Sequence, residues 1–345
     1  MQRSPVKVLI VDDSAFIRML LSQILDSDSD IKVVATAEDP YDAREKIKKY
    51  NPDVITLDVE MPRMDGLTFL GNIMRLRPMP VVMVSTLTQA GADVTIRALE
   101  LGAFDFVAKP VTEVKEQLTL LAQSLIDKVK AAAACNAVAL ETIPPGAKPL
   151  LNLEQSSDQV DLITIGASTG GTEAIHRVIE RLPAKLPPIV MTQHIPDVFS
   201  TSYAKRLNDE VIINVQEVRS PQKLEFGHAY LAPGHQHMKI ERHKNELWAV
   251  LSDAEPVNRH KPAVDVLFES VVASVGERCI GVLLTGMGQD GARGLLKIRK
   301  NGGLTCVQDE QTSVVWGMPG AAVKLDATNR VLPLSQIPGF LLDNL

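Results

Sequence analysis

Val6-Lys-Val-Leu-Ile-Val11 is a short apolar run followed directly by Asp12-Asp13, and three later runs end in a similar way. They are Val54-Ile-Thr-Leu57 before Asp58, Val81-Val-Met-Val84 before Ser85, and Asp105-Phe-Val-Ala108 before Lys109. Apolar runs of this length are typical of the buried strands of a parallel sheet. Ligands gather at the carboxyl ends of such strands. One edge of one sheet is therefore expected to collect all five polar side chains.

Helical patterns alternate with these runs, and five βα units predict a doubly wound α/β domain over residues 1–127. The expected helices are Ser14–Asp26, Tyr41–Lys49, Leu67–Arg75, Gln89–Leu101 and Glu113–Lys128. Residues 128–157 are rich in alanine, proline and serine without an amphipathic period, which is typical of a linker.

Apolar periodicity resumes at Asp161 and predicts a second α/β domain, assigned to residues 158–345, with a mainly parallel sheet. The expected strands are Leu162–Ile165, Ile189–Met191, Val211–Ile213, Ala229–Leu231 and Ile280–Leu284. The expected helices are Thr172–Arg181, Ala263–Val275 and Ala292–Lys300.

Length and composition exclude several classes of protein. At 345 residues the chain exceeds the usual size of one domain. A net charge of -6 argues against nucleic acid as a partner, because binding it needs a basic face. Three cysteines without metal-like spacing argue against a disulfide framework. The N-terminal apolar run of about six residues is too short for a signal peptide or a membrane span. We therefore expect a cytoplasmic protein without direct membrane insertion. A monomer is a separate expectation.

The first group of polar residues has the composition of a phosphoryl-transfer site. Three carboxylates that repel one another are tolerated when a divalent cation lies between them, and hard oxygen ligands suit Mg²⁺. Asp58 would be the phosphoryl acceptor, with Asp12 and Asp13 holding the metal. Lys109 and the Ser85 hydroxyl would contact the phosphoryl oxygens. The alternative is that these are solvated loop residues, and it loses weight because all five occur in order.

These motifs resemble the receiver domain of bacterial two-component response regulators. The matching stretches are Val11-Asp-Asp-Ser-Ala-Phe16, Asp58-Val-Glu-Met-Pro62, Met64-Asp-Gly66 and Lys109-Pro110. The resemblance implies a flavodoxin-like (βα)5 fold and phosphotransfer from a histidine kinase to Asp58. It also implies a shift of Ser85 and Phe106 on activation.

A Gly-x-Ser-x-Gly turn occupies residues 166–170, between an expected strand and an expected helix. This context is typical of a nucleophile elbow, in which glycines permit a tight bend and expose the Ser168 hydroxyl at a helix N-terminus. A phosphate-cradling loop is the competing interpretation, but no Gly-Lys-Ser or Gly-Lys-Thr follows.

A nucleophilic serine needs a base, and His194 is favoured among seven histidines because it follows the strand Ile189–Met191. His176 is better explained as a half-buried helix residue. His235 and His237 would face the same way on a strand as a possible metal pair, although no third ligand is evident.

Asp290 is the favoured orienting acid, because it follows the strand Ile280–Leu284 in a glycine-rich loop before a helix. A helix-capping role is its alternative explanation. Asp253 is expected in an exposed turn and Asp265 within a helix, so both are weaker candidates.

The second half resembles the chemotaxis protein-glutamate methylesterases, the CheB family. The matching stretches are Gly166-Ala-Ser-Thr-Gly-Gly171, Gln193-His-Ile-Pro196, Ala232-Pro-Gly-His235, Gly286-Met-Gly-Gln-Asp-Gly291 and Gly317-Met-Pro319. The resemblance implies a triad of Ser168, His194 and Asp290 that removes methyl groups from glutamate esters of chemoreceptors, and in many members deamidates glutamines. Ester hydrolysis would need no cofactor.

Two further expectations concern the oxyanion and the control of activity. The N–H groups of Thr169 and Met287 are candidate oxyanion donors. The unphosphorylated receiver is expected to inhibit by covering the catalytic edge until Asp58 is phosphorylated. A transcription factor would instead need a basic helix-turn-helix, and a catalytically silent interaction module would not need Ser168.

Overall fold

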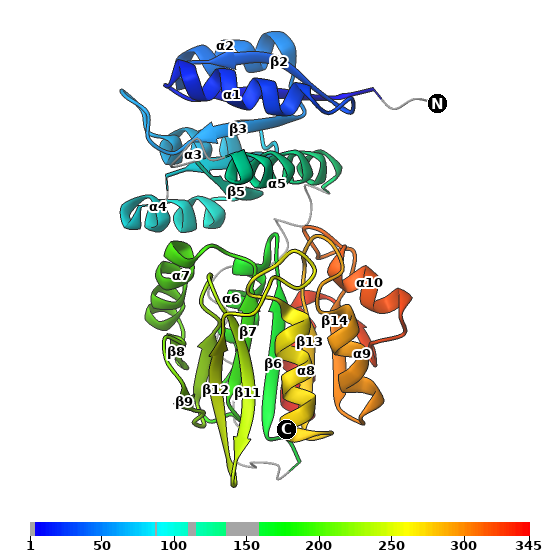
Figure 1. Cartoon of the computed structure of the whole chain (residues 1–345). Helices are drawn as coiled ribbons and strands as arrows, with labels where there is room; N and C mark the ends of the chain where they lie inside the picture. The colour runs from blue at the N-terminus through cyan, green and yellow to red at the C-terminus, as the bar shows by residue number, and fades with distance from the viewer. Residues whose placement is uncertain (1–3, 87, 110–114, 136–158) are drawn as a thin grey trace. The chain divides into compact units, whose positions relative to one another are not determined.

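The computed structural model describes residues 4–86, 88–109, 115–135 and 159–345. The chain divides into two compact units, residues 1–138 and 139–345 (Figure 1). None of the described helices is long and apolar enough to cross a membrane.

The N-terminal unit contains a five-stranded parallel sheet in the order β2-β1-β3-β4-β5. Its strands are β1 (Val6–Val11), β2 (Ile31–Ala37), β3 (Val54–Asp58), β4 (Val81–Ser85) and β5 (Asp105–Ala108). This order confirms the flavodoxin-like prediction, and it reverses direction between β1 and β3. The residues that follow these two strands therefore meet at the switch point of the sheet.

The helices of this unit largely confirm the sequence prediction. They are α1 (Ala15–Asp26), α2 (Pro40–Tyr50), α3 (Gly66–Leu76), α4 (Gln89–Glu100) and α5 (Lys115–Ala134). Ser14 caps α1 by accepting a hydrogen bond from the N–H of Ile17 at 3.4 Å. The end of α5 is the exception, because the helix continues past residue 127 through the alanines assigned to the linker. Alanine has the highest helix propensity, so these residues extend the helix. The remainder of the predicted linker, 136–157, lies outside the described residues.

The C-terminal unit is built on a seven-stranded parallel sheet in the order β15-β14-β13-β6-β7-β10-β8. Its strands are β6 (Leu162–Ala167), β7 (Ile189–Gln193), β8 (Asn214–Glu217), β10 (His228–Leu231), β13 (Cys279–Leu283), β14 (Leu304–Gln308) and β15 (Arg330–Leu332). The chain runs outward from β6 through β7 and returns to β13 on its other side, so the switch point lies at β6. The doubly wound α/β prediction is confirmed for this unit.

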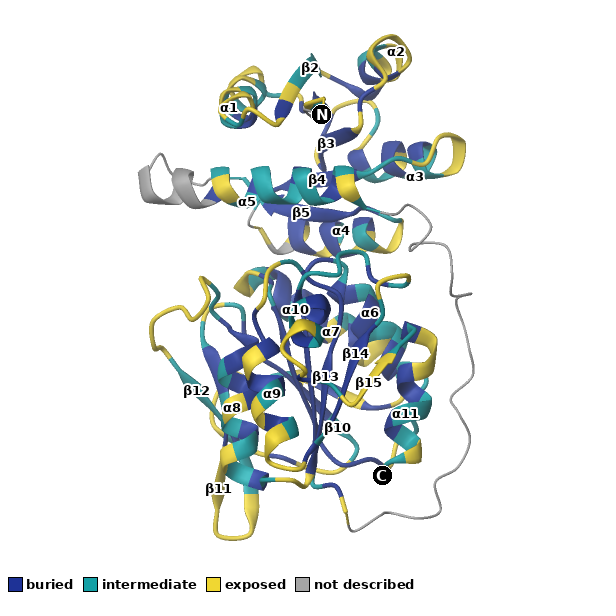
Figure 2. Cartoon of the chain, turned by 90° about the vertical axis from the view of Figure 1, so that its right-hand side faces the viewer, coloured by how far each residue is buried: buried dark blue, intermediate teal, exposed yellow. Residues whose placement is uncertain are grey.

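Two helical layers cover this sheet, whose inner strands are buried (Figure 2). One layer holds α8 (Val264–Val275), α9 (Ala292–Lys300) and α10 (Met318–Lys324), in which α9 packs against both α8 and α10. The other includes α6 (Gly171–Ile179), which packs against the C-terminal segment formed by η2 (Leu334–Gln336) and α11 (Ile337–Asp343). Helix α7 (Asp197–Glu210) packs on β8.

A small antiparallel sheet of order β11-β12-β9 packs on α8. Its strands are β9 (Gln222–Lys223), β11 (His237–His243) and β12 (Glu246–Ser252). Strands β9 and β12 were not predicted from the sequence, and β11 was expected only as the strand that would carry His235 and His237.

The predicted strand Val211–Ile213 is wrong. The N–H of Val211 donates to Leu207 and closes α7, and Ile212 is exposed. Pairing with β10 begins only at Asn214, which lies opposite His228. This apolar run therefore ends a helix instead of entering the sheet.

Candidate functional sites

Three carboxylates meet at the switch point of the N-terminal sheet, as predicted. Oxygen atoms of Asp12, Asp13 and Asp58 lie within 4.8 Å of one another. Asp12 and Asp58 are buried, whereas Asp13 is exposed. The Lys109 ammonium bridges the two buried carboxylates, with Nζ 2.9 Å from Asp12 Oδ2 and 2.8 Å from Asp58 Oδ1.

Burial and ion pairing act in opposite directions on the pKa values of this cluster. It raises the pKa of Asp58 to about 6, and the negative charge of Asp12 acts in the same direction against the lowering effect of Lys109. Burial alone would lower the pKa of Lys109, but its contacts with Asp58 and Asp12 outweigh that effect and raise the pKa. Two buried carboxylates share one ammonium group, so the lysine cannot offset both charges when both carboxylates are ionised.

The donor set fits a hard divalent cation. Asp58 Oδ2 is buried and has no hydrogen-bond partner within the described residues. A buried, unpaired carboxylate oxygen is costly unless a cation or donor meets it. Carboxylates completed by water are the usual ligands of Mg²⁺, so Asp12, Asp13 and Asp58 would hold this ion.

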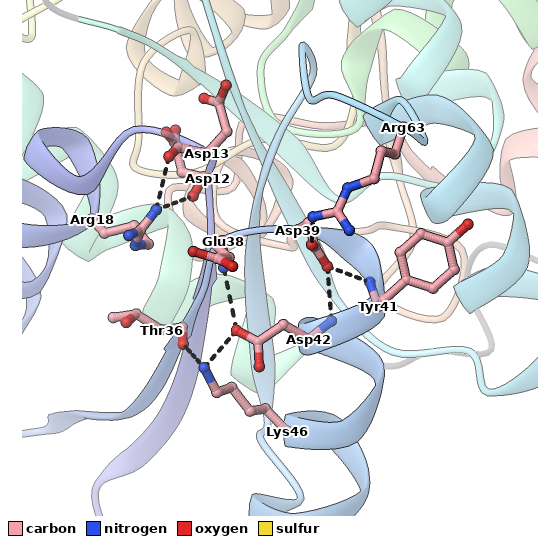
Figure 3. Close-up of polar contacts among 10 residues, drawn as sticks. All are labelled: Asp12, Asp13, Arg18, Thr36, Glu38, Asp39, Tyr41, Asp42, Lys46 and Arg63. Atoms are coloured by element: carbon pink, nitrogen blue, oxygen red, sulfur yellow. Dashed lines mark hydrogen bonds and ion pairs between the residues drawn. The ribbon is translucent and has the colours of Figure 1, made fainter.

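Two arginines that the sequence reading missed brace the surrounding loops (Figure 3). Arg18 on α1 donates from one guanidinium nitrogen to the carbonyls of Asp12 and Asp13, at 2.8 and 2.9 Å. Arg63 pairs with Asp39, the residue that caps α2. No short motif distinguishes these arginines, because their partners are set by loop geometry.

The predicted switch residues lie on the neighbouring strands. The Ser85 hydroxyl is buried and donates to the carbonyl of Gly91 at 3.3 Å. The Phe106 ring is buried on β5, and the Lys128 ammonium lies 5.2 Å from its centroid. Their movement on activation stays a prediction.

The Gly-x-Ser-x-Gly segment forms the predicted strand, turn and helix. Strand β6 ends at Ala167 and α6 begins at Gly171, so Ser168 lies in the bend. Its N–H donates to the carbonyl of Thr285 at 3.0 Å, which ties the bend to the end of β13. Gly170 has a φ of +73°, and a Cβ there would lie 2.6 Å from the Val314 side chain. Only glycine fits such a position without strain.

His194 leaves the sheet next to Ser168, as predicted. Ala167 on β6 pairs with Gln193 on β7, and the His194 N–H donates to the Ala167 carbonyl at 3.2 Å. The following residues, Ser168 and His194, therefore start from adjacent positions on parallel strands. The His194 ring is nearly buried, with Nε2 2.9 Å from Asp290 Oδ2. Its Nδ1 is buried without a hydrogen-bond partner among the described residues.

Asp290 is buried and its two oxygens accept four hydrogen bonds. Oδ2 accepts from His194 and from the N–H of Val264 at 2.6 Å. Oδ1 accepts from Asn258 Nδ2 at 2.7 Å and from the N–H of Asp265 at 3.2 Å. Burial works against ionisation of Asp290, but the His194, Asn258 and Val264 contacts outweigh it and lower the pKa below its usual value.

Asp290 also caps a helix, which was its alternative explanation. The helix is α8, whose own first residues offer no side-chain cap, and not α9, which follows Asp290 in sequence. The same two carboxylate oxygens of Asp290 therefore cap α8 and contact the His194 ring.

The weaker candidates occupy the environments expected of them. Asp253 is exposed and pairs with Lys261 at 2.8 Å, and Asp265 lies in the first turn of α8. His176 on α6 is half-buried and contacts Glu210 at 3.0 Å.

The suggested metal pair of His235 and His237 is wrong. His235 precedes β11, is exposed and contacts Asp197 at 2.6 Å. His237 is fully buried, with Nε2 3.1 Å from the carbonyl of Glu255 and Nδ1 3.1 Å from the N–H of Ala263. Their different burial shows that they do not share a face.

Three residues near Ser168 and His194 were not assigned a role from sequence. Gln193 Nε2 donates to the Ser168 carbonyl at 2.8 Å. Asn258 binds Asp290, and the His260 ring stacks on that of His194. Their partners are distant in sequence, so no local pattern points to them.

The two candidate oxyanion donors lie on segments that meet at the nucleophile turn. The loop that carries Met287 touches the nucleophile turn, since a Cβ on Gly286 would lie 2.8 Å from Ser168 Cβ. Thr169 is buried, and its carbonyl accepts from Thr285 Oγ1 at 3.0 Å. Donation by the N–H groups of Thr169 and Met287 stays a prediction.

The two sites define a class of protein that joins a receiver-type carboxylate cluster to a serine, histidine and aspartate arrangement on a second α/β unit. Comparison with known families agrees. The response regulator receiver domain family matches residues 8–121, and the CheB methylesterase family matches residues 163–341.

Similar proteins cover almost the whole chain. A protein-glutamate methylesterase/protein-glutamine glutaminase 1 from Xanthomonas euvesicatoria pv. vesicatoria is 53% identical over 98% of this chain and 97% of the relative. A protein-glutamate methylesterase/protein-glutamine glutaminase from Hydrogenovibrio crunogenus is 48% identical over 98% of both chains. The CheB methylesterase catalytic domain of Thermotoga maritima covers 54% of this chain and 99% of its own, with 32% identity and a TM-score of 0.53. The chain belongs to the CheB methylesterase family and carries a receiver domain ahead of its methylesterase domain.

Proposed function

We propose that this protein hydrolyses glutamate γ-methyl esters of chemoreceptors, releasing methanol, under the control of phosphorylation at Asp58. The observation that carries the catalytic part is the environment of His194. One ring nitrogen contacts the buried Asp290, while the other is buried and has no hydrogen-bond partner among the described residues. The His194 backbone N–H bonds to the carbonyl of Ala167, the residue before Ser168.

Each side chain has a defined role in the reaction. His194 Nδ1 takes the proton from the Ser168 hydroxyl as its oxygen attacks the ester carbonyl. The protonated ring then gives this proton to the departing methoxide, which leaves as methanol, and an acyl-serine remains. Water attacks the acyl-serine with the same histidine as base, and glutamate and free Ser168 result. Asp290 holds the Nε2–H tautomer and stabilises the imidazolium.

Electrostatic stabilisation of the oxyanion would come from the backbone N–H groups of Thr169 and Met287. A single donor of this kind contributes about 3 kcal/mol. The names of the relatives favour a second activity on glutamine side chains. The same steps would release ammonia from an amide, with His194 protonating the leaving nitrogen.

The receiver domain controls this activity in our proposal. Asp58 accepts a phosphoryl group from a chemotaxis histidine kinase, and Lys109 balances the added charge. Bound Mg²⁺ supplies positive charge beside the acceptor. Raising the active fraction from 1% to 99% requires a shift of about 5.5 kcal/mol. The chemoreceptors are the substrate partner, and the cytoplasmic location and monomeric state stay predictions.

Methanol release from methylated receptor tests the hydrolase. The full chain should release methanol, and Ser168→Ala should not, while Asp58 is still phosphorylated in the variant. Equal release by both proteins would refute the proposed nucleophile.

The control by phosphorylation has a separate test. A small phosphodonor should stimulate the full chain and leave the fragment 158–345, which should be constitutively active, unchanged. A fragment no more active than the unphosphorylated chain would exclude inhibition by the receiver.

A further inference from the structure

A second histidine lies flat against the ring of His194. The centroids of the His194 and His260 rings are 3.7 Å apart, and their planes differ by 7°. The ring of His194 makes one hydrogen bond, to Asp290, and its other nitrogen is unpartnered within the described chain. A single hydrogen bond leaves a ring free to tilt about that contact. The stacked ring supplies the missing constraint on its plane.

A tight turn holds His260 in place. The N–H of His260 donates to the carbonyl of Val257 at 2.9 Å, and the N–H of Val257 donates back at 3.0 Å. The two central residues, Asn258 and Arg259, have φ values of +53° and +69°. Positive φ at both central residues is the mark of a type I′ turn, a two-residue hairpin connection. The backbone at His260 is therefore held by two hydrogen bonds across a tight turn.

The same turn also reaches the carboxylate. Asn258 Nδ2 lies 2.7 Å from Asp290 Oδ1 and 2.8 Å from Asp265 Oδ2. The Asn258 amide thus binds the Asp290 carboxylate, while the His260 ring stacks on the His194 ring. Both contacts come from residues two positions apart, so the acid and the base are fixed by one rigid element.

We propose that His260 is a positioning residue that fixes the ring plane of His194 and so directs its free Nδ1 toward the nucleophile. The inference rests on the proposed function, since it assigns His194 as the base. His260 takes no proton from the substrate and forms no bond to it. Its effect is on the geometry of proton transfer, where a misplacement of about 1 Å can cost about a hundredfold in rate.

Three substitutions of His260 separate ring stacking from simple packing. His260→Phe keeps a flat ring, His260→Leu fills space without one, and His260→Ala does neither. We expect the alanine and leucine variants to lose about 10- to 100-fold in kcat for methanol release with KM nearly unchanged. The phenylalanine variant should keep kcat within about threefold of the parent. His243→Ala is the matched control, because this exposed histidine on β11 contacts Glu241 and should leave kcat unchanged.

Two measurements distinguish a loss of folding stability from a loss of ring positioning. Thermal unfolding identifies variants that are merely destabilised. The His194 Nε2–H proton is hydrogen-bonded to Asp290, which slows its exchange with water. Its NMR signal should persist in His260→Phe, and the proton should exchange faster in His260→Ala and His260→Leu.

We expect that only His260→Phe keeps a kcat near that of the parent. The Nε2–H proton should likewise exchange slowly in the parent and in His260→Phe, and faster in the other two variants. The proposal is overturned if leucine rescues as well as phenylalanine, if phenylalanine fails as alanine does, or if alanine keeps full kcat. The NMR readout needs no turnover. If the parent released no methanol, the proposed function would fail while the stacking role was still measured.

Discussion

Replacing Asp290 with asparagine removes the negative charge that contacts the His194 ring and leaves the volume of the side chain unchanged. Two unit charges 2.9 Å apart attract by about 6 kcal/mol at an effective dielectric constant of about 20. This attraction acts fully only when His194 is an imidazolium, which forms as the histidine takes the serine proton. Losing the attraction therefore raises the energy of the transition state more than that of the free enzyme. Since about 1.4 kcal/mol in the activation barrier corresponds to a tenfold change in rate, the upper limit of the loss in kcat/KM is about 10⁴-fold.

The substitution also disturbs the start of α8. All four groups around Asp290 donate hydrogen bonds, and an asparagine amide accepts at one end only. About two bonds to a charged acceptor are lost, each worth about 1.5–3 kcal/mol. We therefore expect Asp290→Asn to lower the free energy of unfolding of the C-terminal unit by about 3–6 kcal/mol.

Methanol release and urea unfolding measure the two effects separately. Asp265→Asn is the matched control, because this buried carboxylate accepts hydrogen bonds from Gly294 and Asn258, whereas the His194 ring bonds to Asp290. It should destabilise the fold and keep kcat/KM within about tenfold for the folded fraction. A loss of less than tenfold in kcat/KM for folded Asp290→Asn would refute the role assigned to this carboxylate.

Three further predictions concern stability, protonation and metal. Gly170→Ala, at a φ of +73°, should lower the free energy of unfolding by about 1–3 kcal/mol in urea titrations, whereas Gly339→Ala on α11, where a Cβ meets no atom within 4 Å, should not. Burial lowers the pKa of His237, so NMR titration should show this ring neutral until the pH falls below its usual value of about 6.5. Below about pH 6.5 the unfolded state binds more protons than the folded state, so the free energy of unfolding should decrease as the pH falls below that value. Titration of His237 at its usual pKa would contradict the hydrogen bond that its Nδ1 accepts from Ala263. Chelation of Mg²⁺ should abolish phosphorylation of Asp58 by a small phosphodonor and leave unstimulated methanol release unchanged; loss of both activities would show a second metal requirement.

The placement of the site residues could be predicted because parallel sheets collect the residues that follow their strands. Asp12 follows β1 and Asp58 is the last residue of β3, while Ser168 and His194 follow β6 and β7. The two strands of each pair are neighbours in their sheet. The strand patterns and the glycine turn were sufficient to bring these residues to one edge. No contact between side chains had to be known.

The residues that were missed depend on geometry that has no local pattern. Asn258 and His260 reach the site because a type I′ turn aims them at it, and its second central residue is an arginine where glycine would be the usual signal. The cap that Asp290 provides belongs to a helix that precedes it in sequence, so its partners could not be read from its neighbours. Val211–Ile213 was misassigned because a short apolar run can end a helix as well as form a strand.

The most direct test of the central claim is a double-mutant comparison of Ser168→Ala, His194→Ala and the combined variant in the methanol-release assay. Residues that act as one catalytic unit lose their effect together, so each single change should reduce kcat/KM by at least about 10³-fold and the double change should reduce it no further. A double variant whose loss equals the product of the single losses would show that Ser168 and His194 act independently and would contradict the proposed mechanism.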